Sequence, residues 1–219
     1  MKPLDVMLAE FVTPVLRPAR FRKTGRTYRL AAKNGSQALI TFQHYALSPL
    51  SRTGFIVNVG VVVEALRAWM HNRITPSSSY PSQPSIHDSF WHDVIWAPDD
   101  VAHRIDKYRS EVWYFDNAEG AARCGRHLTR IFTEETVPFL TGMLDRGEQL
   151  RVLHDPSIPQ ARVRVGRNYA GETLLRVDDG PSAELDTALA EAERQGDDEF
   201  LSWARTRLDF TSPSPPRAR

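Results

Sequence analysis

The chain has very few of the features from which cross-links and membrane spans are built. Its 219 residues include a single cysteine, Cys124, so no disulfide can form within the chain. No run of about 18 apolar residues occurs, and we therefore expect no membrane-spanning helix. Asp5 and Glu10 interrupt the apolar N-terminal segment, which also lacks a small-residue cleavage site, so we expect no signal peptide. Together these absences are typical of a cytoplasmic protein.

An excess of one charge is also missing. The chain has 28 Lys and Arg against 27 Asp and Glu, a net charge of +1. Such a balance gives no global attraction to nucleic acid or to a membrane surface. No glycine-rich phosphate loop, no G-x-S-x-G motif and no cysteine pair occurs in the sequence. We therefore expect no metal and no cofactor, and we favour a non-enzymatic protein.

Two apolar runs of the β type define the fold class. Residues 37–45 and 54–63 alternate with period two, as strands do. One face of the second run is wholly apolar and consists of Phe55, Val57, Val59, Val61 and Val63. Such a face indicates a sheet covered by helices. Residues 27–32 predict a further strand, which the Asn34-Gly35 turn joins to the first run as a hairpin. Residues 112–115 predict another strand. The prediction is an α+β fold in which an antiparallel sheet of about four to six strands carries its helices mainly on one face.

Helical periodicity appears at both ends of the chain. Apolar residues from Leu4 to Leu16 recur at three- and four-residue intervals. Pro14 predicts a kink or break in this helix, and Pro18 predicts its end. Asp116 or Asn117 is a suitable N-cap for a helix that reaches Phe132. Residues 182–194 and 197–209 predict a C-terminal helical pair broken at Gly196.

We expect three regions along the chain: an α+β core domain over residues 1–150, an extension with the helical pair over 151–210, and a disordered tail over 211–219. The Ser/Pro-rich segment 75–85 predicts a mobile loop. Residues 160–178 are either a hairpin, formed by 162–165 and 173–177, or irregular.

Short motifs in the first two thirds of the chain point to a family. They are Pro14 and Leu16, then Phe21, Lys23 and Gly25, then Gln43, and finally Phe55, Asn58 and Gly60. In this pattern the sequence resembles the bacterial domain-of-unknown-function family numbered four-three-zero-four, over about residues 5–145. Arg20 departs from the family, which usually has glycine before Phe21, and we expect a less tight helix exit there. The resemblance implies an α+β fold, no established activity and no catalytic residues, and it suggests an immunity or defence role.

A basic turn is the leading candidate for partner binding. Six cations fall within residues 17–29, namely Arg17, Arg20, Arg22, Lys23, Arg26 and Arg29, with Phe21 and Tyr28 among them. Such a segment can bind an acidic protein, or it can bind a phosphate backbone and stack bases. The alternative is a solvated turn whose charges are balanced by acids elsewhere, and the balanced total charge favours this reading over nucleic acid. If the turn does bind a partner, we favour a protein over RNA or DNA.

Two pairs in the predicted strands are further candidates. Trp113 and Tyr114 are neighbours, so they face opposite sides of the sheet, and the exposed one is a candidate interface anchor. Gln43 and Asn58 are carboxamides in apolar strands. They either contact a ligand on the sheet floor, or bond to each other or to a loop backbone, and we favour the second reading.

Two segments carry residue types used in catalysis. His87, Asp88, His92 and Asp93 could serve a hydrolase or nuclease-like enzyme if their side chains converge in a pocket, although the His–His spacing matches no usual zinc motif. Cys124 and His127 are one helical turn apart, but a cysteine in an amphipathic helix is more often a core residue. The sequence therefore favours a cytoplasmic, non-enzymatic protein that recognises another protein.

Overall fold

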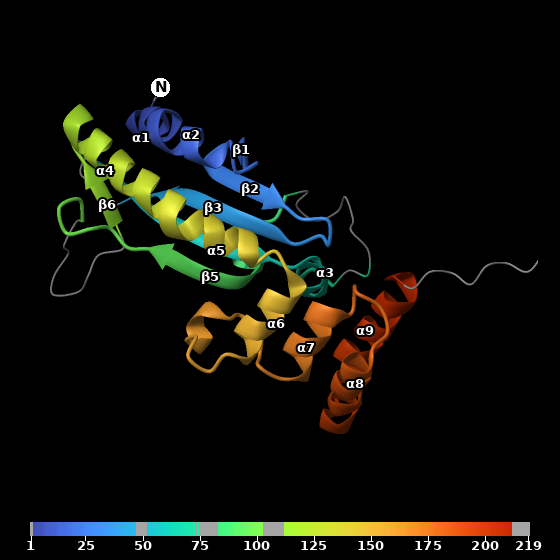
Figure 1. Ribbon diagram of the computed structural model, residues 1–219. Coiled ribbons are helices and arrows are strands. Elements are labelled where there is room, and N and C mark those ends of the chain that lie inside the picture. Colours follow the sequence, from blue (N-terminus) through green and yellow to red (C-terminus); the bar gives the residue numbers. More distant parts are fainter. Residues whose placement is uncertain (1, 47–51, 73, 75–82, 103–111, 212–219) are drawn as a thin grey trace, which may run out of the picture. The chain divides into compact units, whose positions relative to one another are not determined.

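A six-stranded sheet with antiparallel pairs organises the fold, in the order β1-β2-β3-β4-β5 with β6 paired to β4 (Figure 1). The computed structural model describes residues 2–46, 52–72, 74, 83–102 and 112–211. The strands are β1 (Arg22–Thr24), β2 (Thr27–Ala31), β3 (Gln37–His44), β4 (Thr53–Val62), β5 (Ser89–Ile95) and β6 (Val112–Phe115). The fold is α+β, as predicted.

The described chain forms two compact units. Unit 1 contains Met1–Ala32, Gln37–Val61 and His92–Leu144, and unit 2 contains Lys33–Ser36, Val62–Trp91 and Asp145–Arg219. The expected division into residues 1–150 and 151–210 stays a prediction about independent folding. Most of the predicted loop 75–85 and of the predicted tail 211–219 lies outside the described residues.

Two hairpins begin the sheet. Thr24 pairs with Thr27 across the β1–β2 turn, and Gly25 between them has a φ of 60°, which a two-residue hairpin turn with glycine at its first position requires. In the β2–β3 connection Gly35 has a φ of 80°, and the Asn34 side chain accepts a hydrogen bond from the Ser36 amide at 3.0 Å. The Asn-Gly signal therefore marks a hairpin, as predicted, whereas the short strand β1 was not predicted inside the basic turn.

The helices of unit 1 cover one face of the sheet (Figure 1). They are α1 (Pro3–Met7), η1 (Leu8–Val12) and α2 (Thr13–Leu16), followed later by α4 (Ala118–Ile131), η3 (Phe132–Thr136) and α5 (Val137–Gly142). Aromatic rings fill the interface: the Phe42 and Phe132 centroids are 6.2 Å apart, and Phe55 stacks on Trp113 at 6.0 Å. The predicted apolar face of β4 is buried throughout, with Phe55, Val57, Val59 and Val61 all at most 4% exposed.

The two helical segments of unit 1 are joined by a close contact at Gly125. A Cβ at this position would lie 2.3 Å from Cγ of Phe11, so only glycine lets the ring rest on the backbone of α4. The Thr129 hydroxyl adds a hydrogen bond to the Phe11 carbonyl at 3.2 Å. This contact brings η1 directly against α4.

Each of these segments widens into a π-helical turn just before a proline. η1 precedes Pro14 and η3 precedes Pro138. A proline has no N–H, and its ring clashes with the carbonyl four residues earlier, so the wider turn lets the helix continue. The Thr13 amide accordingly bonds to the Leu8 carbonyl, five residues back. The irregularity expected at Pro14 is this π-turn.

Unit 2 is built mainly from helices. They are α3 (Glu64–Met70), η2 (Ile86–Asp88), α6 (Arg146–His154), η4 (Gln160–Arg162), α7 (Tyr169–Arg176), α8 (Ala183–Gln195) and α9 (Asp198–Thr211). Trp69 packs edge-on against Phe200 at 5.1 Å. Arg207, only 3% exposed, holds both carboxylate oxygens of Asp178, with its Nε 2.7 Å from Oδ1. The predicted C-terminal pair is present as α8 and α9, separated by Gly196 with a φ of 71°.

The expectation for residues 160–178 was wrong. Residues 169–176 form helix α7 rather than a strand or an irregular segment. The Asn168 side chain caps the helix by accepting a hydrogen bond from the Ala170 amide at 3.1 Å. A Cβ on Gly171 would lie 2.2 Å from the Gly166 carbonyl oxygen, so glycine permits a close backbone approach that alternation arguments do not detect.

The Gly125 contact gives a direct test of helix packing. We expect Gly125→Ala to lower the free energy of unfolding by about 2 kcal/mol, because Phe11 must move away from α4. Gly142→Ala is the matched control, since its Cβ would meet nothing within 4 Å, and we expect it to be neutral or slightly stabilising. Urea unfolding followed by circular dichroism measures both, and equal stability of the two variants would contradict the packing argument.

Candidate functional site

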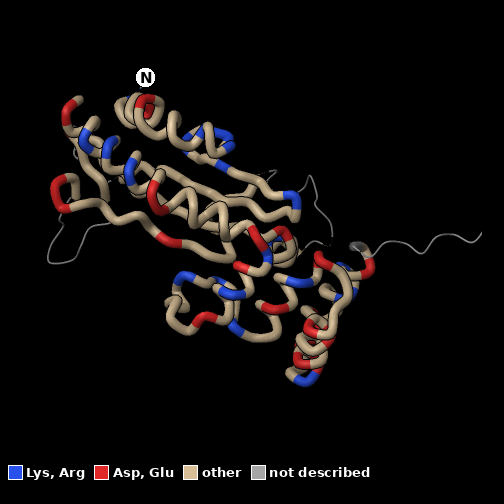
Figure 2. Tube along the Cα trace, in the orientation of Figure 1, with Lys and Arg blue, Asp and Glu red and all other residues tan. Residues whose placement is uncertain are grey.

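Four exposed cations gather where α2 passes into β1. They are Arg17, Arg20, Arg22 and Lys23, and we call them the basic edge. Figure 2 shows Lys and Arg positions concentrated at this junction. Among the described residues none of the four makes an ion pair, although the Lys23 ammonium lies 5.4 Å from the Tyr28 ring centroid. The basic edge is therefore available to an external anion.

A tight helix cap holds this surface in place. The Phe21 amide donates to the Leu16 carbonyl and the Arg20 amide to the Arg17 carbonyl, both at 3.0 Å, which is the Schellman pattern. Arg20 occupies its left-handed position with a φ of 66°. The expectation of a less tight exit was wrong, because arginine adopts the conformation that glycine would adopt more cheaply.

The other two arginines of the basic turn have a different role. Arg26 donates from Nε to Oδ1 of Asp5 at 2.7 Å and from Nη2 to Oδ2 at 3.1 Å, a two-pronged ion pair. The hydrogen bond from Arg26 holds the pKa of Asp5 below its usual value. Burial lowers the pKa of the Arg29 guanidinium. The structure therefore separates Arg26, a predicted partner-binding residue, from the four cations of the basic edge.

The vicinal pair Trp113 and Tyr114 divides between the two faces of the sheet. Trp113 is fully buried, and its indole Nε1 donates to the Ile95 carbonyl at 2.9 Å. Tyr114 is half-buried on the opposite face, where its ring lies 6.5 Å from that of Tyr45. Trp113 has no accessible surface in this structure, so it is not an exposed anchor, and Tyr114 is the member of the pair that keeps some accessible surface.

A polar row crosses three strands. Nδ2 of Asn58 donates to Oε1 of Gln43 at 3.4 Å, and Nε2 of His92 lies 3.5 Å from Oδ1 of Asn58. Asn58 is buried and Gln43 is exposed. The two carboxamides bond to each other, as the favoured reading predicted. The contact between His92 and Asn58 was not predicted from the sequence.

The residues proposed for hydrolysis are engaged separately. Asp88 accepts hydrogen bonds from the Ser85 amide at 2.7 Å and the Ser85 hydroxyl at 3.1 Å, and lies 3.3 Å from Nε2 of His71. His92 instead contacts Asn58, and the His87 side chain is exposed. Within the described residues no three His, Cys, Asp or Glu side chains are grouped so as to hold a metal. Asp88 therefore caps η2, whereas His92 belongs to the polar row.

Cys124 and His127 do not form a pair. The Cys124 thiol is fully buried and contacts the Tyr114 carbonyl at 3.5 Å, and burial raises its pKa to about 12. His127 instead places Nε2 3.0 Å from Oδ2 of Asp100, and this hydrogen bond lowers the pKa of Asp100. A neutral, buried thiol is a core residue rather than a nucleophile.

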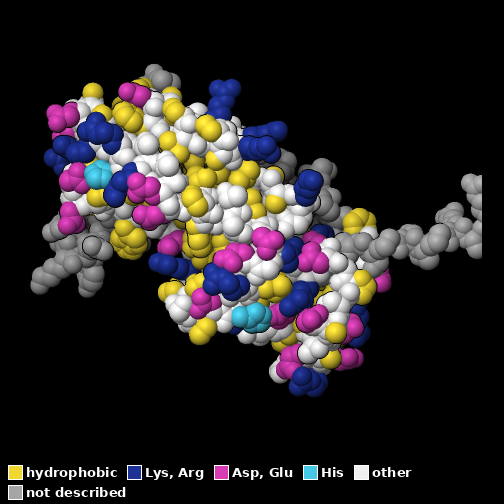
Figure 3. All heavy atoms as spheres, viewed as in Figure 1, with side chains coloured by type: hydrophobic (Ala, Val, Ile, Leu, Met, Phe, Trp, Pro, Cys, Tyr) yellow, Lys and Arg dark blue, Asp and Glu magenta, His cyan; other side chains and the backbone are white. Residues whose placement is uncertain are grey.

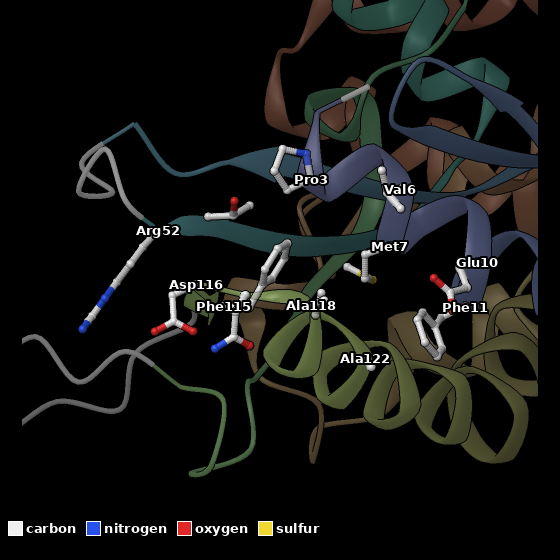
Figure 4. A pocket seen from close by; sticks show the side chains of 13 residues that line it. Pro3, Val6, Met7, Glu10, Phe11, Arg52, Phe115, Asp116, Ala118 and Ala122 are labelled. Atoms are coloured by element: carbon white, nitrogen blue, oxygen red, sulfur yellow. The ribbon is translucent and has the colours of Figure 1, made fainter.

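Sequence reasoning missed a groove of about 510 Å³ between α1 and the start of α4 (Figure 4). It is lined by Pro3, Val6, Met7, Glu10, Phe11, Arg52, Thr53, Phe115, Asp116, Asn117, Ala118, Ala121 and Ala122. The alanines at helical spacing were the available signal, but nothing in the sequence places α1 beside α4.

A comparison with protein families matches residues 12–142 to the Domain of unknown function DUF4304. The match covers more than half of the chain. The chain belongs to the DUF4304 family. The DUF4304 match includes the basic edge and the α4 side of the groove, whereas the α1 residues of the groove precede it. No curated protein and no solved structure matches the chain. In the described part of this DUF4304 protein, no helix is long and apolar enough to cross a membrane.

Burial of the single cysteine predicts its reactivity. We expect Cys124 of the folded protein to resist iodoacetamide at pH 8 and to react rapidly once urea unfolds the chain, because burial suppresses both access and thiolate formation. Intact-protein mass spectrometry reads one adduct or none. Rapid labelling of the native protein under non-denaturing conditions would show that the thiol is accessible.

Proposed function

We propose that this protein is a non-enzymatic binding module whose basic edge recognises an acidic segment of another protein. Arg17, Arg20, Arg22 and Lys23 would bind the carboxylates, and no catalytic group takes part. The immunity or defence setting suggested by the family resemblance belongs to this proposal as the process in which such recognition acts.

The conformation of Arg20 carries the proposal. A residue other than glycine in the left-handed region costs about 1–2 kcal/mol. Such outliers persist where the surrounding structure enforces them, and they cluster at functional sites. Arg20 makes no ion pair within the described chain, so its guanidinium has no evident structural use. We infer that its use is to contact a partner.

A protein partner suits this surface better than nucleic acid does. Phe21 and Tyr28, the aromatic residues of the basic turn, are 4% and 1% exposed, so neither is open for base stacking. Four cations are also fewer than the roughly 6–10 phosphate contacts that strongly salt-dependent DNA binding uses. Carboxylates on a protein segment need only a small cluster of guanidinium groups.

Charges on an edge strand also protect it from pairing with other sheets. Arg22 and Lys23 lie on β1, which is at the end of the strand order, and can serve this purpose. Arg17 and Arg20 precede the strand, so edge protection does not account for them. The decisive variant is therefore at Arg20.

We expect Arg20→Gly to stabilise the fold and to weaken partner binding. Glycine removes the backbone strain but adds entropy to the unfolded chain, so the free energy of unfolding should rise by about 0.5–1 kcal/mol. Loss of the guanidinium should weaken binding of a glutamate-rich peptide about fivefold. Chemical unfolding and fluorescence anisotropy at low salt measure the two effects.

The charge control is Arg126→Gln, which removes an exposed arginine from α4. It should change peptide binding less than twofold. A combined R17Q/R20Q/R22Q/K23Q variant should abolish binding, whereas R123Q/R126Q/R130Q should retain most of it. Equal losses in both sets would reduce the effect to net charge, and tighter binding of single-stranded DNA than of the peptide would favour nucleic acid instead.

A further inference from the structure

The groove between α1 and α4 is a second candidate surface, and it shares no residue with the basic edge. Figure 4 shows its walls: Pro3, Val6 and Met7 from α1 face Ala118 and Ala122 from α4, with Phe115 between them. The contact of Phe11 with Gly125 closes it at one end. From there the groove opens toward the N-terminal ends of both helices.

The chemistry of the groove is apolar along its length and charged at its ends. Met7 and Phe115 are buried beneath it, while Val6 is 40% exposed at its rim. Glu10 lies toward the Phe11 end, and Asp116 and Arg52 lie at the open end (Figure 4). None of these three charged residues makes an ion pair within the described chain. The lining therefore carries one more negative than positive charge.

The dimensions and the small side chains of α4 fit a helix. Ala118, Ala121 and Ala122 have three- and four-residue spacing, so they leave room for a neighbouring backbone to approach. On the α1 side the lining runs from Pro3 to Phe11, about 12 Å at 1.5 Å per residue. That length accommodates about two turns of a helix lying along the groove.

The charges at the ends select among occupants. A small-molecule site has polar groups that converge on one part of the ligand, whereas here the middle is apolar and the charges are separated. An amphipathic helix has the complementary arrangement, with an apolar stripe and charged ends. Asp116 and Arg52 balance each other at the open end, so Glu10 is the uncompensated acid and favours a basic residue at the Phe11 end.

We propose that this groove binds an amphipathic helix of another protein through a stretch about two turns long, with apolar residues at three- and four-residue intervals and a Lys or Arg beside Glu10. Figure 3 shows hydrophobic side chains between charged ones on the visible part of unit 1. This site acts independently of the basic edge.

The test uses synthetic peptides of about three helical turns, made of Leu and Ala with Lys at both ends. Three peptides are compared: this one, a scrambled peptide whose leucines share no face, and one with Glu in place of Lys. Fluorescence anisotropy against the full chain should rank the first peptide at least fivefold tighter than the other two. Equal binding of the scrambled peptide would overturn the proposal.

Two variants locate the binding. Ala121→Trp should fill the groove and weaken binding at least tenfold, while Ala190→Trp, at an exposed alanine of α8, should have no effect. Glu10→Lys leaves the apolar floor intact and should reverse the preference between the Lys-ended and Glu-ended peptides. Because Glu10 is exposed, this variant also serves if Ala121→Trp fails to fold.

Further outcomes separate this proposal from its alternatives. Arg20→Gly should leave binding of the Lys-ended peptide unchanged, so failure of the basic edge as a site and failure of the groove are distinguishable. If sedimentation detects a dimer that Ala121→Trp abolishes, a second copy of this chain occupies the groove and the proposed partner is wrong. An unchanged preference in Glu10→Lys would likewise reject the charge pairing.

Discussion

The contact of Phe11 with the backbone of Gly125 is the constraint on which the helical layer of unit 1 depends. With no Cβ at residue 125, the ring rests against the backbone of α4, and the Thr129 hydroxyl donates to the Phe11 carbonyl. Two segments far apart in the sequence are thereby held together over the apolar face of the sheet. Close packing leaves little freedom for either helix to shift without disturbing the other.

This constraint explains why both helices need their π-turns. A helix pressed against a partner over its length cannot simply break at a proline, because the segment beyond the break would lose its packing. Widening by one residue before Pro14 and Pro138 keeps the chain helical while avoiding the clash of each proline ring. The first of these turns leads directly into α2, which ends at Leu16, immediately before the basic edge.

The sequence predicted features that depend on local periodicity. The alternation of β4 identified its buried face, and the adjacency of Trp113 and Tyr114 required that they separate, as they do. It failed where a close backbone approach decided the outcome. Thr173 and Val177 favour a strand by propensity, yet the Asn168 cap and the contact allowed by Gly171 stabilise α7. The Asn168 cap is a local signal that the strand-like residues outweighed, whereas the close approach of Gly166 to Gly171 leaves no trace in the alternation.

The candidate sites show the same division. Clustering of cations in residues 17–29 was visible in the sequence, but which of them are available depends on Asp5, which packing brings to Arg26 from 21 residues away. The groove depends on two helices whose proximity no motif encodes.

The backbone strain at Arg20 links the stability of the fold to the proposed binding of a partner. Glycine would complete the same helix cap without a backbone penalty, so the cap alone gives no reason for arginine. The structure places the cost at a position whose side chain projects from the protein and has no ion pair in the described chain. Arg26, nine residues from Arg17, instead secures α1 through Asp5 and is no longer available. Within one basic segment, then, Arg26 stabilises the fold through Asp5, while Arg20 carries backbone strain and makes no ion pair in the described chain.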